Sequence, residues 1–281
     1  AVLNNAGRAH LEGFGSLEGV AKAKAEILNG LEADGLFVYN GDDRFAELWR
    51  ALAGNRRRRT FGVREPADVS SPLGEYSVVW QDDHFEARFP VICEAGEVEI
   101  GLRLAGEHNR MNALAAVAAS LEVGATLASC ARALARIEPV PGRLCPVRGI
   151  GGARVIDDSY NANPDSVAAA MHVLTGLGGN SVMVLGDLAE LGDDPRGIHQ
   201  VLGKVAKELG VQRLYTLGPL SEAAAEEFGD GGHAYPELEP LVEDLKRHAT
   251  ADDIILVKGS RSAHMERVVD ALVEQSGEKR C

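Results

Sequence analysis

The first half of the chain carries two alternating hydrophobic patterns. Apolar residues recur with helical spacing over residues 18–31, 45–52, 109–122 and 127–137. Short apolar runs that end in polar turns, as buried parallel strands do, cover residues 35–40 and 60–63. Three further short runs predict a small antiparallel insertion at residues 76–80, 85–91 and 98–104. Because helices and strands alternate, this half is predicted to be an α/β domain with a parallel sheet.

The second half repeats the alternation after a linker rich in proline and glycine at residues 139–143. Strands are predicted at residues 154–156, 181–185, 213–217, 233–235 and 253–257. Helices are predicted at residues 166–177, 198–209, 221–228, 238–248 and 265–275. This order predicts a doubly wound, Rossmann-like domain. We therefore expect an α/β protein of two domains, residues 1–143 and residues 144–281.

Composition excludes some partners. The 281 residues hold 29 Lys and Arg against 42 Asp and Glu, a formal charge of −13. Nucleic-acid binding through phosphate neutralisation is therefore not expected, and the basic run at residues 56–59 reads as a solvated loop. No apolar stretch is long enough for a membrane span, so no membrane insertion is expected. The four cysteines are far apart in the sequence and are expected to be reduced thiols of a cytoplasmic protein.

Polar residues gather where the predicted strands of the second half end, at the edge where doubly wound sheets bind ligands. The strongest run is Asp157-Asp158-Ser159-Tyr160-Asn161-Ala162-Asn163-Pro164. Asn163 and Pro164 suit the cap and first turn of the next helix, which leaves Asp157, Asp158, Tyr160 and Asn161 without a structural explanation. The run Lys258-Gly259-Ser260-Arg261 has the composition of an anion site.

Four other positions are ambiguous from the residues alone. His10 could be a metal ligand, but a loop histidine bonded to the backbone is the more common case. Lys24 on a helix is expected to be solvated. Asn109 lies where a helix N-cap would lie, whereas capping leaves Asn112 unexplained; side-chain amides suit the edge of a purine. Arg143, in the linker, could clamp a phosphate or simply face water.

Taken in order, these runs resemble the signatures of the Mur ligase family of peptidoglycan synthesis. They are His10-Leu11-Glu12-Gly13-Phe14-Gly15-Ser16, Ala21-Lys22-Ala23-Lys24, Gly106-Glu107-His108-Asn109 with Asn112-Ala113-Leu114, Val140-Pro141-Gly142-Arg143, Asp157 to Asn163, Gly186-Asp187-Leu188-Ala189-Glu190-Leu191-Gly192, and Val257 to Ser262. Each run is weak alone, but together they cover the chain from end to end in the family's order. The runs at residues 157–163 and 258–262 resemble the branch that adds D-alanyl-D-alanine.

The resemblance implies an ATP-dependent amide ligase that joins D-alanyl-D-alanine to UDP-N-acetylmuramoyl-tripeptide through an acyl phosphate. It implies Mg²⁺ held by His10 and by Lys24 as a carbamate. This replaces the interpretation of His10 as a backbone-bonded loop residue and of Lys24 as a solvated lysine. Asn109 and Asn112 would hold adenine, Arg143 the γ-phosphate, and Asp158 the nucleotide. Lys24, His10 and Arg143 would be the catalytic residues. The site for the peptide substrates would be lined by Tyr160, Asn161, Asp187, Glu190, Lys258, Ser260 and Arg261.

One departure from the family pattern concerns the phosphate loop. No Gly-x-x-Gly-Lys-Thr/Ser run occurs in these 281 residues. The resemblance thus identifies residues 1–143 as the carboxyl part of the central ATP-binding domain and residues 144–281 as the C-terminal domain. We expect the 281-residue chain alone not to turn over ATP, and we expect a cytoplasmic monomer. Two alternatives stay open, a sister ligase acting on folate-like substrates and a truncated non-catalytic α/β module. A dinucleotide oxidoreductase is not expected, because no Gly-x-Gly-x-x-Gly follows a strand.

Overall fold

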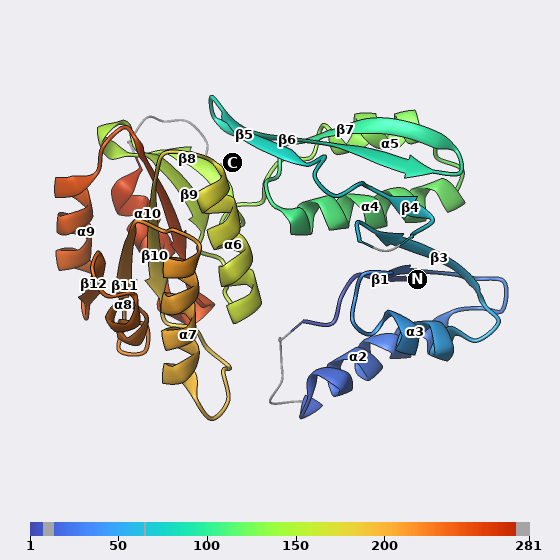
Figure 1. The fold of residues 1–281 in the computed structure, drawn as a ribbon, viewed down its shortest axis with the longest axis horizontal. Coiled ribbons are helices and arrows are strands. Elements are labelled where there is room, and N and C mark those ends of the chain that lie inside the picture. Colours follow the sequence, from blue (N-terminus) through green and yellow to red (C-terminus); the bar gives the residue numbers. More distant parts are fainter. Residues whose placement is uncertain (8–13, 65, 274–281) are drawn as a thin grey trace. The chain divides into compact units, whose positions relative to one another are not determined.

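The chain folds into two compact units, which are described separately. The computed structural model describes residues 1–7, 14–64 and 66–273 (Figure 1). Unit 1 comprises Ala1–Val78 and Glu86–Ile137, and unit 2 comprises Val79–Phe85 and Glu138–Cys281. The α/β class is confirmed, because helices and strands alternate in both units. The predicted domain boundary after Arg143 stays a prediction.

The sheet of unit 1 has seven strands in the order β1-β2-β3-β4-β6-β5, with β7 paired to β6, and its residues 79–85 are grouped with unit 2. The strands are β1 (Val2–Leu3), β2 (Leu36–Asn40), β3 (Arg57–Gly62), β4 (Val69–Ser70), β5 (Ser77–Gln81), β6 (His84–Cys93) and β7 (Gly96–Leu102). Strands β1 to β4 are parallel, and β6 runs antiparallel to β4 and β7. The sheet is therefore parallel with a small antiparallel insertion, as predicted.

Helices cover both faces of this sheet. They are α2 (Leu17–Ala25), which continues as the 3₁₀ turn η1 (Glu26–Gly30), α3 (Ala46–Ala53), α4 (Glu107–Glu122) and α5 (Leu127–Leu134). Successive side chains of a strand point to opposite faces. Strand β2 accordingly places Phe37 and Tyr39 in the core with α2 and α3, and Val38 in the core with α4 and α5.

The basic run at residues 56–59 is not the solvated loop that the composition predicted. Most of it belongs to β3, which pairs with β2 along its length. Arg59 lies 2.7 Å from Glu122 of α4 and 2.8 Å from Glu94, and its side chain is only 16% exposed. The acidic partners neutralise the run locally, so a strand can hold it.

Unit 2 contains a six-stranded sheet in the order β12-β11-β10-β13-β9-β8. The strands are β8 (Cys145–Arg148), β9 (Arg154–Asp158), β10 (Asn180–Gly186), β11 (Arg213–Leu217), β12 (Gly232–Tyr235) and β13 (Asp253–Lys258). All are parallel except β8, which runs antiparallel to β9 and was not predicted from the sequence.

The helices of unit 2 lie on both faces of its sheet, as Figure 1 shows. They are α6 (Pro164–Gly176), α7 (Pro195–Glu208), α8 (Glu222–Phe228), α9 (Leu238–His248) and α10 (Glu266–Leu272). Helix α7 packs against α6 and α8, while α9 packs against α10. Leu241 of α9 and Val268 of α10 share one core with Val184 and Val257 of the sheet. The doubly wound prediction is confirmed.

The expectation of reduced thiols is confirmed for Cys93 and Cys130, which carry free thiols. Burial raises the pKa of the Cys130 thiol, which disfavours its thiolate. Cys281 lies outside the described residues.

Gly203 of α7 lies against the backbone of α8, and replacing it tests this packing. A Cβ there would lie 2.1 Å from the carbonyl oxygen of Ala224, and a backbone atom cannot rotate away. We expect G203A to lower the free energy of unfolding by about 1–3 kcal/mol. The matched control is G176A at the end of α6, where a Cβ would meet nothing within 4 Å. Urea unfolding should show no loss for G176A, and equal losses in both variants would contradict the packing.

Candidate functional site

A buried ion pair joins three loops at the carboxyl edge of the unit 2 sheet. The Lys258 Nζ lies 2.6 Å from Asp158 Oδ2 and also donates to the Asn161 carbonyl at 2.9 Å. The Leu144 amide donates to the other oxygen of Asp158. Burial raises the pKa of the Asp158 carboxyl, and Lys258 opposes that rise. Three of the predicted site residues are therefore held together, and the Asp158 carboxylate already has partners on both oxygens.

Several polar residues of the neighbouring loop have a structural role. Asp157 accepts hydrogen bonds from the amide and hydroxyl of Ser159 and so forms a turn. Asn163 caps α6 by accepting from the Ser166 amide, and Pro164 is the first residue of that helix, as predicted. Asp157, which the sequence left unexplained, thus has a structural role.

Arg143 and Tyr160 lie in contact within unit 2. The Arg143 guanidinium carbon is 4.4 Å from the centre of the Tyr160 ring, a cation–π geometry. The Tyr160 amide donates to the Gly142 carbonyl at 3.0 Å. The sequence placed both residues at the site but did not predict this contact, because their partnership depends on how the linker folds back onto the loop after β9.

Asp187 and Ser260 lie together at the ends of β10 and β13. The Ser260 hydroxyl donates to the Asp187 carbonyl at 2.6 Å, and its amide donates to the same oxygen at 3.1 Å. The Asp187 carboxylate accepts from the amides of Leu220 and Ser221. Gly218 is required beside it, because a Cβ there would lie 2.5 Å from the carboxyl carbon of Asp187.

Glu190 and Arg261 lie at the surface of unit 2. Glu190 is exposed and has a φ of 57°, in the left-handed region that few non-glycine residues adopt. Arg261 is exposed and its nearest acidic partner is Glu266, at 3.5 Å. Within the described residues, Arg261 pairs with Glu266 and not with the Asp158 pair or the Asp187 cluster, so the structure does not gather every residue predicted for the substrate.

His199 explains how the loop that follows Asp187 is held. Its Nε2 accepts from the Leu188 amide at 3.1 Å, and its Nδ1 lies 2.7 Å from the Pro195 carbonyl oxygen. One nitrogen must accept and the other must donate, so this fully buried imidazole is a neutral tautomer with its proton on Nδ1. The histidine is thus a support of the site rather than a group that faces it.

In unit 1, Asn109 and Asn112 form a chain of side-chain amides with Asn4. Asn4 donates to Asn112, and Asn112 donates to Asn109 at 3.3 Å. The prediction that Asn109 caps α4 is wrong. The helix begins earlier, and its N-cap residue is Gly106, whose φ of 101° suits a glycine. Asn109 instead donates to the Ala105 carbonyl at 2.8 Å from within the first turn.

Arg110, which the sequence did not mark as a site residue, holds helix α4 in place. Its guanidinium is buried, donates to the Ser71 hydroxyl at 2.8 and 3.0 Å, and lies over the Tyr76 and Phe89 rings. The Tyr76 hydroxyl accepts from the Gly106 amide, and burial raises the pKa of that phenol to about 12. In the sequence, the signal for this role was an arginine on a helix face that is otherwise apolar.

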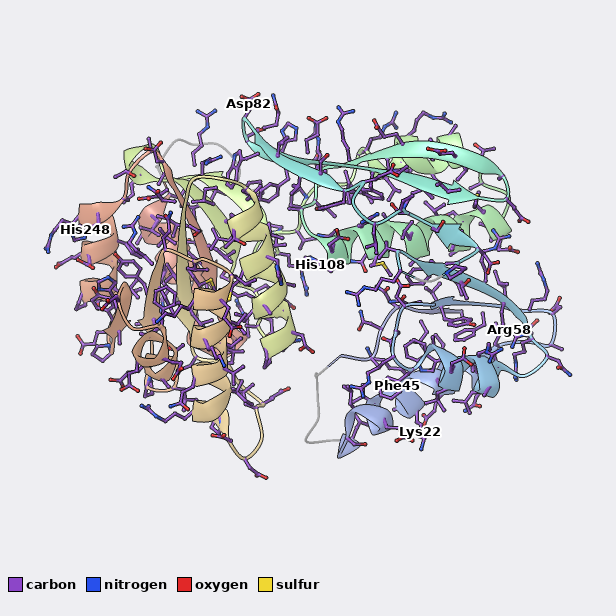
Figure 2. The ribbon with its side chains drawn as sticks, viewed as in Figure 1. Lys22, Phe45, Arg58, Asp82, His108 and His248 are labelled. Carbon is purple, nitrogen blue, oxygen red and sulfur yellow. The ribbon has the colours of Figure 1, made fainter. Side chains whose placement is uncertain are left out.

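Lys24 lies on α2 beside the segment that follows β1. Its exposed Nζ donates to the Asn5 carbonyl at 2.9 Å. Lys22, labelled in Figure 2, instead pairs with Glu18 at 2.7 Å and is exposed. The other predicted metal ligand, His10, lies outside the described residues. The two lysines of this run therefore have different surroundings, which the sequence alone could not distinguish.

Residues 1–7, 14–64 and 66–273 contain no group of three His, Cys, Asp or Glu side chains that could hold a metal ion. His10 lies outside these residues. In the same part of the chain, no helix has the length and apolar character that crossing a membrane requires.

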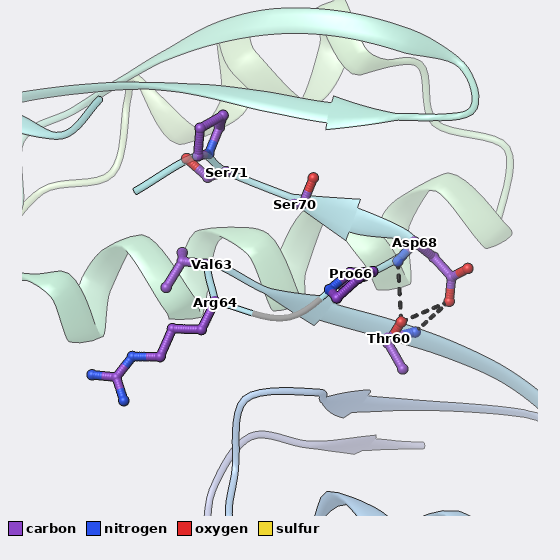
Figure 3. A pocket seen from close by; sticks show the side chains of 9 residues that line it. Thr60, Val63, Arg64, Pro66, Asp68, Ser70 and Ser71 are labelled. Atoms are coloured by element: carbon purple, nitrogen blue, oxygen red, sulfur yellow. Dashed lines mark hydrogen bonds between the residues drawn. The ribbon is translucent and has the colours of Figure 1, made fainter. Parts of the chain in front are cut away.

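Each unit has a pocket near the carboxyl ends of its strands. The pocket of unit 2, about 440 Å³, is lined by Asp187, Leu217, Gly218, Pro236, Glu237, Leu238, Glu239, Ser262, Ala263 and Arg267. The pocket of unit 1, about 520 Å³, lies between β3 and β4. Figure 3 shows it, with the Asp68 carboxylate accepting from Thr60. Among the predicted site residues that the structure describes, Asp187 alone lines either of these two pockets.

Comparisons with known proteins match both halves of the chain. Residues 1–120 match the family "Mur ligase middle domain", and residues 142–261 match "Mur ligase, glutamate ligase domain". The UDP-N-acetylmuramoyl-tripeptide–D-alanyl-D-alanine ligase of Escherichia coli is 41% identical over 98% of this chain and 60% of its own length. The ligase of the same name from Bacillus subtilis is 33% identical over 98% of this chain and 59% of its length.

Solved structures agree with the sequence matches. A crystal structure of MurF from Acinetobacter baumannii superposes with a TM-score of 0.86 at 33% identity, over 96% of this chain and 58% of that one. A folylpolyglutamate synthase from Thermotoga maritima reaches 0.67 at 16% identity over 99% of this chain and 61% of that one, which shows a shared fold alone. The chain spans about 60% of the length of the curated relatives it matches.

Proposed function

The chain belongs to the Mur ligase family, and from that premise we propose that it is the middle and C-terminal part of an ATP-dependent ligase. The whole protein would join D-alanyl-D-alanine to UDP-N-acetylmuramoyl-tripeptide in peptidoglycan synthesis, on which cell shape and division depend. One observation carries this proposal: relatives named for this reaction are 30–41% identical over 97–99% of the chain.

The proposed reaction has two steps. ATP transfers its γ-phosphoryl group to the terminal carboxylate of the tripeptide, which forms an acyl phosphate and releases ADP. The amine of D-alanyl-D-alanine then attacks the acyl carbon, a tetrahedral intermediate forms, and its collapse expels phosphate and leaves an amide bond. The carboxylate alone is a poor electrophile, so phosphorylation supplies the leaving group, and charge on the moving phosphoryl must be neutralised.

Four residues are proposed for the nucleotide. Asn109 and Asn112 offer amide donors and acceptors that suit the edge of adenine. Arg143 makes no side-chain hydrogen bond or ion pair within the described residues, so its donors are available for the γ-phosphate. Asp158 is proposed to hold the nucleotide, and its bonds to Lys258 and to the Leu144 amide fix the position of its carboxylate.

Lys24 and His10 are the residues we propose for Mg²⁺. Carbamylation would convert the Lys24 ammonium to a carboxylate-like oxygen donor, the ligand type that this hard cation prefers. The amine is exposed, so it is accessible to carbon dioxide, and a carbonyl oxygen of the same hard type lies 2.9 Å away at Asn5. When bound, the cation would supply charge neutralisation at the phosphates. Lys24, His10 and Arg143 are thus the proposed catalytic residues.

The peptide substrates are proposed to meet the loops of unit 2. The residues proposed for them are Tyr160, Asn161, Asp187, Glu190, Lys258, Ser260 and Arg261. The pocket beside Asp187 combines carboxylates, one arginine and apolar side chains, which suits a small zwitterion with methyl groups. We also propose that the whole protein is a monomer. Its place would be the cytoplasm, since its nucleotide-linked substrate and ATP are cytoplasmic compounds.

Coupled phosphate release by the full-length enzyme tests the proposed function. Phosphate should appear only when ATP, Mg²⁺, the UDP-linked tripeptide and D-alanyl-D-alanine are all present, and mass spectrometry should find the pentapeptide product. Glutamate and folylglutamate as alternative acceptors discriminate against a sister ligase. Product with either of these, and none with the dipeptide, would contradict the proposal.

The asparagine pair gives a second prediction for the full-length enzyme. Replacing Asn109 and Asn112 together by leucine removes the amides proposed for adenine, and KM for ATP should rise roughly tenfold, the loss of one or two net hydrogen bonds. KM for D-alanyl-D-alanine should not change, since no amide of this pair would contact it. A rise in the KM of the dipeptide in place of that of ATP would remove the adenine role.

A further inference from the structure

We propose that Tyr160 is a positioning residue whose ring holds the Arg143 guanidinium ready for the nucleotide phosphate. This inference rests on the proposed function, because the role of Arg143 toward ATP comes from the family resemblance. The Tyr160 contact itself is a feature of unit 2 alone. The guanidinium carbon lies 4.4 Å from the ring centre, well within the roughly 6 Å over which such contacts act.

The backbone brings the two side chains together. The Tyr160 amide donates to the Gly142 carbonyl at 3.0 Å, and the Arg143 amide donates to Val140 at 2.9 Å. Gly142 has a φ of 75°, and a Cβ there would lie 3.0 Å from the Tyr160 Cβ. Leu144 adopts a φ of 48°, unusual for a leucine, while its amide is held by Asp158. These contacts fix the linker against the loop that carries Tyr160. The backbone therefore brings the Arg143 and Tyr160 side chains into contact.

The ring of Tyr160, and not its hydroxyl, makes the contact with Arg143. The residue is 47% exposed, and within the described part of the chain its hydroxyl has no hydrogen-bond partner. The guanidinium carbon lies over the ring, and within the described residues the Arg143 side chain makes no hydrogen bond or ion pair. Its N–H fork is therefore available to bind two phosphate oxygens.

Holding the arginine in advance lowers the cost of binding. A free arginine side chain loses much rotamer freedom when it engages a ligand, and a preorganised one loses less. An exposed cation–π contact is weak, so its removal should raise KM for ATP only about two- to fivefold. The effect on KM for ATP should depend on Arg143, since the contact orients the group proposed to bind the phosphate of ATP.

The test uses the full-length enzyme with Y160L, Y160F and R143A, alone and combined. We expect Y160L to raise KM for ATP two- to fivefold with kcat nearly retained, and Y160F to restore it, because phenylalanine keeps the ring. In the R143A background Y160L should add nothing. Thermal unfolding of the 281-residue variants checks that Y160L folds as the parent does.

Three results would overturn the proposal. Y160F could fail to restore KM for ATP, which would assign the role to the hydroxyl. Y160L could leave KM for ATP unchanged, whatever it does to KM for the peptide substrates, which would show that the ring does not position Arg143. Y160L could also act equally with and without Arg143. A full-length enzyme with no ligase activity would defeat the proposed function instead, so the two failures are distinguishable.

Discussion

Replacing Lys24 by alanine in the full-length enzyme is expected to reduce ligase activity at least about 100-fold. The proposed carbamate supplies an oxygen ligand for the cation that neutralises phosphate charge, and such stabilisation is worth several kcal/mol, each 1.36 kcal/mol being tenfold in rate. The amine lies in place for this role, 2.9 Å from the carbonyl of Asn5 at the exit of β1. The measurement is phosphate release under saturating substrates.

The chain offers a matched control in Lys22, which lies on the same helix. Its ammonium pairs with Glu18 and its side chain is 60% exposed, so K22A should retain the parent's activity. Adding formate or acetate should partly rescue K24A, since a short carboxylate can replace the carbamate oxygens. Full activity of K24A would end the carbamate hypothesis. Loss without rescue, together with loss in K22A, would point to a damaged helix.

Replacing Lys258 by methionine should lower the free energy of unfolding by about 3–5 kcal/mol at pH 8. The substitution leaves the Asp158 carboxylate buried without its cation, the situation in which one half of a buried ion pair is removed. K204A is the control, because that lysine is 65% exposed and lies 3.8 Å from Glu208; it should change stability by less than about 1 kcal/mol. Urea unfolding of the 281-residue chain measures both.

The pH dependence of K258M provides an independent check. Burial already raises the pKa of folded Asp158 above its ordinary value, and Lys258 is the main opposing influence. Without the lysine the folded pKa rises further, so the folded chain binds a proton more tightly than the unfolded chain does. Stability from that proton is present at low pH and is lost as pH rises through the folded pKa. The deficit of K258M should therefore shrink from pH 8 to pH 5, and a constant deficit would contradict a buried charge.

Local sequence was sufficient to predict most of the helices and strands. Strand β10 and helix α7 depend on apolar periodicity within the segment itself, and the cap at Asn163 depends on side chains a few residues apart. Strand β8 was missed because its short segment follows a proline-rich linker and is defined by its pairing with β9. The basic run in β3 was misread because its acidic partners, Glu94 and Glu122, are distant in the sequence.

The sequence by itself determined the α/β class, the order of most helices and strands, and the family, because these depend on local periodicity and on the order of short motifs. It also nominated the site residues. Only the tertiary structure decided which of them meet: Asp158 with Lys258, Asp187 with Ser260, and Arg143 with the ring of Tyr160. The first two partnerships arise because parallel strands bring their carboxyl ends to one edge of a sheet. The third arises because the linker folds back onto the loop after β9, and sequence distance encodes neither kind of closeness.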